Sequence, residues 1–292
     1  MDTPSAPPFP KHPKFWTGGI HIIESLKPGE IRTGESLHGV VEPICSAAHP
    51  PIRAFYHKVA TRGEFIGRLE RIAEWILAEH RAPIIHIECH GCGDGLSFAS
   101  DEFITWSDLQ PLLTKINVLC NLNLLVTLGA CHGMWLVHVI QPAQRAAVWG
   151  LVGSSRAVKA REIEPAFSAF FWMLFARRDG ALAVEAMNDA VADGDRPFHF
   201  FGAEQMFGEA FRQYLKVECS DARLDERVRA VIDREEPAGL PVAERRRRHA
   251  LLRKFISDHR RMFESMKEDF FFLRRNPENQ VRFPISYENV AS

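Results

Sequence analysis

Two short segments of the chain end an apolar run in residues that could do covalent chemistry. Residues 84–91 read IIHIECHG, and residues 124–133 read LLVTLGACHG. The first places His90 at the end of its run, and the second does the same for Cys131. A thiol and an imidazole a few ångströms apart are the minimal apparatus for nucleophilic catalysis. They can act together only if the fold places the ends of these two runs side by side.

The hydrophobic pattern around these segments predicts an α/β fold. Continuous apolar runs, or runs rich in aromatic and β-branched residues, indicate strands, and apolar residues spaced by three and four indicate helices. The expected strands are 19–23, 52–59, 84–88, 124–130 and 147–152. The expected helices are 63–79, 107–119, 166–176 and 182–191. Such strands, separated by amphipathic helices, favour a mainly parallel sheet covered on both faces, which is a three-layer fold.

The chain is expected to have three parts. Residues 1–16 are rich in proline and predict a flexible lead-in, 17–202 form the α/β domain, and 203–292 form a helical C-terminal extension. Within the domain, Ser107 and Gln110 match a capping box at the start of one helix.

Three further segments carry expectations about local structure. A loop containing Pro28, Gly29 and Gly34 should follow the first strand. In the extension, one long amphipathic helix is expected over 252–270. The run Arg245 to Arg248 could bind phosphate, but acidic neighbours and a balanced net charge favour the solvated face of a helix.

Composition excludes several classes of protein. Lys and Arg number 36 and Asp and Glu 37 in 292 residues, so the net charge of −1 argues against a bulk basic nucleic-acid binder. No apolar leader opens the chain, and its longest apolar stretch, residues 166–176, is shorter than the roughly 20 residues of a membrane span. A cytoplasmic protein without direct membrane insertion is therefore expected. In that compartment the six cysteines argue against a disulfide framework.

The expected fold places both motifs where α/β proteins bind ligands. In open parallel sheets, ligands sit outside the carboxyl ends of the strands. If the strands that precede His90 and Cys131 are neighbours, both side chains project from one edge of the sheet. Gly91 would let a substrate carbonyl approach closely and would leave its N–H free to face a developing oxyanion.

On these motifs the chain resembles the caspase-like cysteine peptidases, and more closely their bacterial CHAT branch. The stretch HIECHGCGDGLSFASDEFITWSDL resembles the histidine motif with its strand pair and helix, and LLVTLGACHG resembles the cysteine motif. The similarity covers about residues 19–200 and leaves out the C-terminal helices. His132 is a departure, because CHAT sequences more often carry a small polar residue after the cysteine.

The resemblance implies a role for each matching residue. Cys131 would be the nucleophile and His90 the proton donor and acceptor of a dyad, with the N–H groups of Gly91 and Cys131 as the oxyanion hole. Ser154, Ser155 and Arg156 would line the substrate pocket. Neither a cofactor nor a metal is implied.

The resemblance also implies a biological setting. It suggests a thiol protease with a protein substrate in bacterial regulated cell death or antiphage (antiviral) defence, such as a gasdermin-like pore former. The C-terminal helices would serve gating or the docking of a regulatory partner. Nucleic acid is not an expected partner.

Other interpretations of these residues stay open. The domain could be a catalytically silent caspase-like interaction module, or a thiol-dependent hydrolase of a small molecule. Cys131 could be a buried strand-end cysteine, and Cys89 with Cys92 forms a C-x-x-C that is a weak zinc signal. His86 is expected in the core or behind the site. Glu88 either orients His90 or is a buried, hydrogen-bonded carboxylate.

Overall fold

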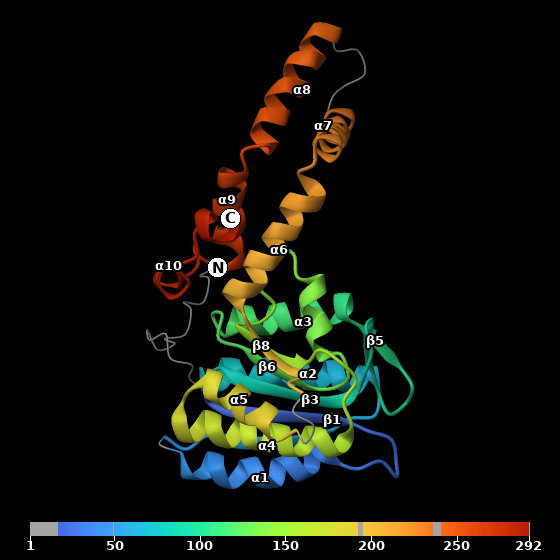
Figure 1. Cartoon of the computed structure of the whole chain (residues 1–292), viewed down its shortest axis with the longest axis vertical. Helices are drawn as coiled ribbons and strands as arrows, with labels where there is room; N and C mark the ends of the chain where they lie inside the picture. Colours follow the sequence, from blue (N-terminus) through green and yellow to red (C-terminus); the bar gives the residue numbers. More distant parts are fainter. Residues whose placement is uncertain (1–16, 49, 192–194, 236–240, 292) are drawn as a thin grey trace. The chain divides into compact units, whose positions relative to one another are not determined.

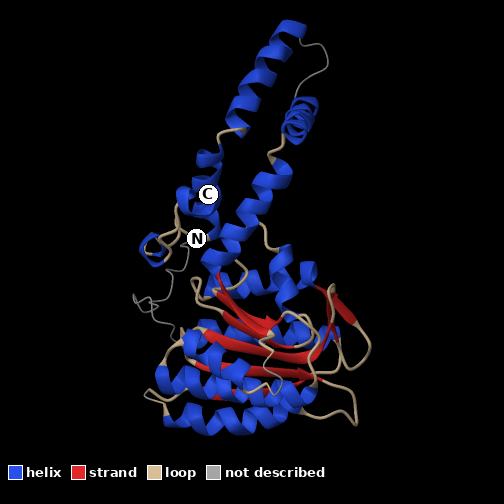
Figure 2. Ribbon diagram, in the orientation of Figure 1, coloured by secondary structure: helices blue, strands red, loops and turns tan. Residues whose placement is uncertain are grey.

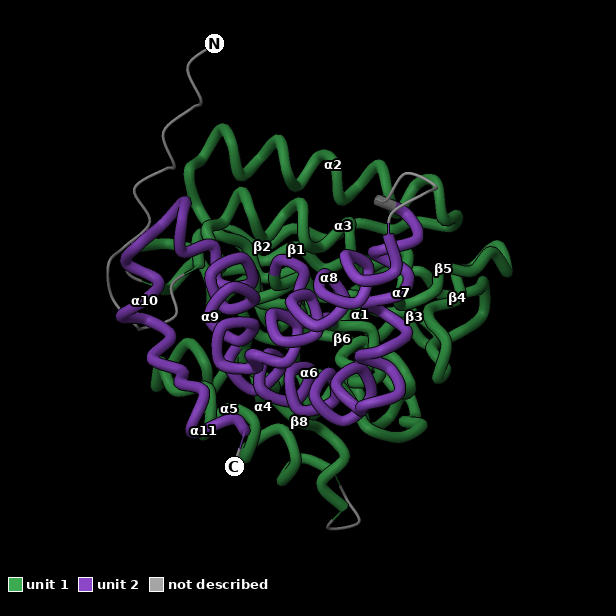
Figure 3. The backbone as a smooth tube through the Cα atoms, turned by 90° about the horizontal axis from the view of Figure 1, so that it is seen from above, with its two compact units in different colours: residues 1–140, 146–203 green, residues 141–145, 204–292 purple. Residues whose placement is uncertain are grey.

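The structure is a computed structural model that describes residues 17–48, 50–191, 195–235 and 241–291. The chain divides into two compact units, 1–140 with 146–203 and 141–145 with 204–292 (Figure 3). The first unit thus ends next to the boundary expected between 202 and 203. The lead-in expected over 1–16 lies outside the described residues.

A mainly parallel sheet forms the centre of the first unit (Figure 2). Its main strands are β1 (Gly19–Ser25), β2 (Arg53–Lys58), β3 (Pro83–Gly91), β6 (Leu125–Gly129), β7 (Gly150–Ser154) and β8 (Phe198–Gly202). They run in the order β2-β1-β3-β6-β7-β8, and every neighbouring pair is parallel except β7 and β8. Two short antiparallel strands, β4 (Gly95–Ser97) and β5 (Phe103–Thr105), continue from the end of β3. The predicted α/β class with a mainly parallel sheet is therefore confirmed.

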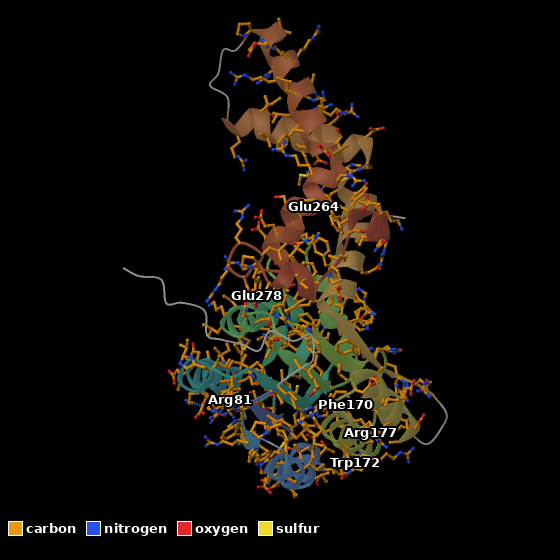
Figure 4. All side chains as sticks on the ribbon, turned by 90° about the vertical axis from the view of Figure 1, so that its left-hand side faces the viewer. Arg81, Phe170, Trp172, Arg177, Glu264 and Glu278 are labelled. Atoms are coloured by element: carbon orange, nitrogen blue, oxygen red, sulfur yellow. The ribbon has the colours of Figure 1, made fainter. Side chains whose placement is uncertain are left out.

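Helices cover both faces of this sheet (Figure 1). One face carries α1 (Thr33–Ala47), α4 (Ala160–Arg177) and α5 (Gly180–Asp189), and the other carries α2 (Arg62–Glu79) and α3 (Trp106–Leu119). A short 3-10 helix, η1 (Gly133–Val139), follows β6. On α4, Phe170 is buried in the core, whereas Trp172 is exposed (Figure 4). Such alternation around a helix is what packing one face against a sheet requires.

Helix α1 corrects the expectation of a loop through Gly34. Leu37, Val41 and Cys45 recur every four residues and are fully buried, so they form one continuous apolar stripe. This stripe packs against the core and stabilises the helix although Pro43 lies within it. Tertiary packing thus outweighs the low helix propensity of proline and glycine.

Helix α3 begins differently from the prediction. It starts at Trp106, and the hydroxyl of Thr105 accepts a hydrogen bond from the N–H of Asp108 at 3.0 Å. The capping box predicted for Ser107 and Gln110 is wrong, because both residues already lie inside the helix. Thr105, two residues before Ser107, is the N-cap and satisfies one of the free N–H groups of the first turn.

The regular elements of the second unit are helices in the residues that the structure describes. Its helices are α6 (Ala203–Glu218), α7 (Asp221–Glu235), α8 (Val242–Ile256), α9 (His259–Phe270), α10 (Asn279–Arg282) and α11 (Tyr287–Ala291). Rings of Phe207 and Phe211 pack edge-on against Phe263, with centroids 5.3 Å and 5.1 Å apart. Among the described helices of the whole chain, none combines the length and apolar character that a membrane crossing requires.

The single helix expected over 252–270 is wrong. Helix α8 ends at Ile256, and the carboxylate of Asp258 accepts a hydrogen bond from the N–H of Arg261 at 3.1 Å, which caps the start of α9. An apolar pattern can continue across such a break, so it does not reveal the cap. The side chains of residues 245–248 on α8 are exposed.

Asn188 fastens the antiparallel edge strand β8, for which no strand is expected from the sequence. Its buried amide donates to the C=O of Phe198 at 2.9 Å and accepts from the N–H of Phe198 at 3.0 Å. Asn188→Ala should lower the free energy of unfolding of the first unit by about 1–3 kcal/mol, because two buried backbone groups lose their partner. The tryptophans among the described residues all lie in this unit, so their fluorescence during urea unfolding reports on it. Asp189→Ala, on the exposed side of α5, should change stability by less than about 0.5 kcal/mol; equal losses in both variants would contradict this.

A pair formed by the buried His21 and the half-buried His57 should make the first unit sensitive to acid. Nδ1 of His21 lies 3.1 Å from Nε2 of His57, and the ring of His21 stacks on Phe55 at 4.6 Å. Burial above all lowers the pKa of His21 to about 3 and that of His57 to about 4, whereas both take up protons near pH 6.5 when unfolded. The unfolded chain therefore binds more protons, and stability present above pH 6.5 is lost as the pH falls towards 4.

The matched test is the pH dependence of the urea midpoint in the tryptophan signal. Between pH 7.5 and 5 this dependence should be weaker in His21→Phe, which keeps the stacked ring and removes one titrating group. His199→Gln, at an exposed position, should leave it unchanged. An identical slope in His21→Phe and the unaltered chain would show that this pair does not cause the acid sensitivity.

Candidate functional site

The pairing of β3 with β6 brings the two motifs side by side. Their parallel register ends with Glu88 opposite Gly129, so the same register continued by two residues puts His90 level with Cys131. A Cβ on Gly91 would stand 2.3 Å from the carbonyl oxygen of Cys131 and 3.3 Å from its nitrogen. The backbones of the two motifs are therefore in direct contact at the carboxyl edge of the sheet.

Both side chains belong to the face of the sheet that α1 and α4 cover. His86 packs edge-on against Phe167 of α4, with centroids 4.6 Å apart. Side chains two apart in a strand share a face, so Glu88 and His90 lie on the same side as His86. Cys131 packs against the core cluster to which Phe167 belongs. Thiol and imidazole thus share both an edge and a face.

Cys131 follows β6 in a tight turn and is half-buried. Its sulfur accepts a hydrogen bond from the N–H of Val158 at 3.3 Å, and the carbonyl oxygen of Val158 lies 3.5 Å away. Val158 stands just before α4, so this contact ties the turn to the start of that helix. The N–H points at the atom on which negative charge would develop in a thiolate.

Most other cysteines of the described chain are in poorer positions to react. Burial raises the pKa of the thiols of Cys45, Cys89, Cys120 and Cys219. Cys92 is exposed, in the turn between β3 and β4. Cys131 is the cysteine that combines partial exposure with a place at the carboxyl edge beside His90.

His90 is the last but one residue of β3, and its side chain is 55% exposed. Its Nε2 lies 2.8 Å from Oε1 of Glu30, which comes from the loop between β1 and α1. Among the described hydrogen bonds, none joins His90 to Cys131. The contact between imidazole and sulfur that catalysis requires stays a prediction, and such bonds often tighten only when substrate is bound.

Glu30 is a residue that the sequence analysis did not assign to the site. Partial burial pulls the pKa of its carboxyl upward, but hydrogen bonds from His90 and from the N–H of Lys27 outweigh this and hold the pKa below its usual value. Glu30 is therefore ionised at neutral pH and faces the imidazole as a carboxylate. The Pro28-Gly29 pair just before it is a turn signal that could have drawn attention to this position.

Glu88 does not contact His90. Its carboxylate lies 2.6 Å from Nε2 of His86 and also accepts a hydrogen bond from the hydroxyl of Thr33, at the start of α1. Nδ1 of His86 lies 2.8 Å from the hydroxyl of Thr127 on β6. Of the two alternatives, the buried and hydrogen-bonded carboxylate is the right one, and His86 is a fully buried core residue as expected.

The segment predicted to line the substrate pocket lies beside the cysteine turn. The C=O of Arg156 accepts a hydrogen bond from the N–H of His132 at 3.0 Å. Ser154 is fully buried and its hydroxyl donates back to the C=O of Arg156, so its side chain faces inward.

The guanidinium of Arg156 is held between Glu162 at 2.8 Å and Asp195 at 2.5 Å. Ser155, whose N–H donates to the C=O of Pro197, is part of the same turn. The role of these three residues in substrate binding stays a prediction.

His132 takes the left-handed backbone conformation, with φ of 56°. Its ring packs edge-on against Trp135, at a centroid distance of 6.0 Å, and Trp135 also lies under Gly93 of the β3–β4 turn. His132 therefore takes part in contacts within the cysteine loop.

A cavity of about 1210 Å³ lies elsewhere in the first unit. Thr17 and Trp149, which stand before β1 and β7, belong to its lining, so it lies near the amino ends of these strands. Neither His90 nor Cys131 lines it. Within the described ranges, no three His, Cys, Asp or Glu side chains are grouped so that they could hold a metal ion.

No protein-family model matches the chain, and no curated protein matches it.

Gly91 should tolerate no side chain. An alanine there would push its Cβ against the backbone of Cys131, which cannot move without shifting the turn. Gly91→Ala should lower the free energy of unfolding, measured by tryptophan fluorescence, by about 1–3 kcal/mol. Gly67→Ala is the control, since Gly67 lies inside α2 with nothing within 4 Å of its added Cβ and should become slightly more stable. A neutral Gly91→Ala would contradict the close contact of the two motifs.

Proposed function

We propose that this chain is a cysteine endopeptidase of the caspase-like type, with Cys131 as nucleophile and His90 as general acid and base. The observation that carries the proposal is the parallel pairing of β3 and β6. It sets an imidazole and a half-buried thiol on one face of one sheet edge, with their backbones in contact. The resemblance of both motifs to the CHAT peptidases supports the same assignment.

The proposed reaction follows from the two side chains. His90 takes the proton of the Cys131 thiol, and the thiolate attacks the carbonyl carbon of a peptide bond to form a tetrahedral oxyanion. The N–H groups of Gly91 and Cys131 would donate to that oxyanion. The imidazolium of His90 then gives its proton to the leaving amine as the C–N bond breaks. Water, deprotonated by His90, hydrolyses the resulting thioester and restores the thiol.

A polypeptide is the substrate class that this proposal favours. His90 is more than half exposed at the edge of the sheet, so an extended chain can reach it without entering an enclosed cavity. The resemblance to the CHAT branch further suggests a protein cleaved in bacterial cell death or antiphage defence. A gasdermin-like pore former is the first such protein to test as a substrate.

The experiment that tests the proposal compares single cysteine variants with an irreversible peptidyl probe. Purified chain is treated with peptidyl acyloxymethyl ketones of varied sequence, and the labelled residue is located by mass spectrometry. Labelling should be lost in Cys131→Ala and in His90→Ala. It should persist in Cys92→Ala, which removes the exposed thiol two residues beyond His90.

Cleavage of a peptide library should follow the same pattern as labelling. Labelling that survives Cys131→Ala would contradict the proposed nucleophile. A Cys131 that reacts with the probe but supports hydrolysis of small thioesters or esters only would favour a small-molecule hydrolase. A folded chain that neither reacts nor cleaves would favour a silent interaction module.

A further inference from the structure

We propose that Glu30 is a positioning residue that makes the site a Cys131–His90–Glu30 triad in place of a dyad. It would hold the Nε2–H of His90, so that Nδ1 is the nitrogen that exchanges protons with the thiol. This inference rests on the function proposed for Cys131 and His90. It is carried by the 2.8 Å contact between Nε2 of His90 and the carboxylate of Glu30.

A tight turn sets the place of Glu30. The N–H of Glu30 donates to the C=O of Lys27 at 3.2 Å, which closes a four-residue turn. Pro28 and Gly29 occupy its two central positions, and Gly29 has a φ of +92°. Proline followed by a residue with positive φ is the arrangement of a type II turn. The N–H of Lys27 also donates to Oε2 of Glu30 at 2.6 Å, so that one carboxylate oxygen holds the turn while the other faces His90.

The base of this loop is fastened inside the first unit. The buried carboxylate of Glu24, at the end of β1, accepts hydrogen bonds from the hydroxyl of Tyr56 at 2.6 Å and from the N–H of Gly34 at 2.8 Å. Arg32 contacts both Tyr56 and Glu24: its guanidinium donates to the hydroxyl of Tyr56 at 2.9 Å and lies 3.4 Å from the carboxylate of Glu24. The two residues that enter and leave the loop are thereby joined across its base.

The tip of the loop is tied to the strand pair on its other side. The ammonium of Lys27 pairs with the carboxylate of Asp101, which lies between β4 and β5. The hydroxyl of Ser25 accepts a hydrogen bond from the N–H of Ala99 at 2.9 Å. An exposed ion pair usually contributes little to stability, because forming it costs the entropy of ordering both side chains. For the pair of Glu30 with His90 this cost is smaller, because the fastened loop already holds the carboxylate of Glu30 in place.

The order of the strands brings the three side chains together in the order carboxylate, imidazole, thiol. Strands β1, β3 and β6 are neighbours; Glu30 lies in the loop that follows β1, His90 lies near the end of β3, and Cys131 lies in the turn that follows β6. Because an ionised carboxylate can only accept, the proton on the shared bond belongs to Nε2. Nδ1 of neutral His90 is then the free base, and it takes the thiol proton as the thiolate forms. Glu30 would stabilise the imidazolium until Nδ1 passes that proton to the leaving amine.

The first test reads His90 directly and needs no turnover. In chain labelled with ¹⁵N-histidine, the His90 signals are identified by their loss in His90→Asn, and the fraction of the neutral ring with its proton on Nε2 is measured. This fraction should fall in Glu30→Ala and recover in Glu30→Asp. It should not change in Glu42→Gln, which alters an exposed carboxylate on α1 away from the site.

The second test measures turnover of the best peptide from the library. Glu30→Ala should lower kcat by roughly 10²–10⁴-fold with little change in KM, and Glu30→Asp should restore part of it. Gly29→Ala should give a smaller fall in kcat, because alanine resists the positive φ that places Glu30, although its Cβ would meet nothing. Gly67→Ala is the matched control and should keep full activity.

The two tests separate the two proposals. An active chain in which Glu30→Ala changes neither the His90 tautomer nor kcat would overturn the triad and leave the peptidase standing. A chain without Cys131-dependent activity in which Glu30→Ala still shifts the tautomer would overturn the peptidase while the positioning contact stands. An active chain with a shifted tautomer and an unchanged kcat would also overturn the triad, since Glu30 would then be a structural partner only.

Discussion

The parallel pairing of β3 with β6 is the constraint on which the candidate site depends. Strands that run in the same direction end at the same edge, and their register decides which residues meet there. With Glu88 opposite Gly129, the residues that follow are level, and glycine at position 91 lets the two chains approach to backbone contact. A shift of one residue in this register would turn His90 to the opposite face from the thiol.

Beneath this edge lies a layer of buried polar groups that fixes the strands and helix α1 together. His86 links Thr127 of β6 to Glu88, and Glu88 in turn binds Thr33 at the start of α1. Every one of these partners is needed, because a buried carboxylate or imidazole without a hydrogen bond is costly. Glu24 likewise holds the loop that carries Glu30, because its buried carboxylate accepts hydrogen bonds from Gly34 and Tyr56. The exposed residues of the site therefore stand on groups that have little freedom to move.

The sequence predicts those parts of this arrangement that depend on local pattern. Continuous apolar runs predicted the strands beneath His90 and Cys131, since a central parallel strand is buried on both faces. Helix α1 was not predicted, because Pro43 and two glycines lower the helix propensity of this segment. Its apolar stripe stabilises the helix only through packing against the folded core. The contact of Glu30 with His90 was not predicted for a different reason: it joins residues that are 60 positions apart in the sequence. A Pro-Gly pair predicts a turn, but not which side chain the turn presents.

The alternation of a strand also explains why Cys89, which is adjacent to His90 in the sequence, is poorly placed to be the proposed nucleophile. Cys89 and His90 are adjacent, so their side chains point to opposite faces of the sheet. Cys89 is buried, which raises the pKa of its thiol, while Cys92 lies beyond the strand in an exposed turn. The C-x-x-C is therefore split between the core and the solvent, as a zinc-binding knuckle is not. Because Cys89 points to the other face, the thiol that shares the face of His90 is that of Cys131, in the turn after β6.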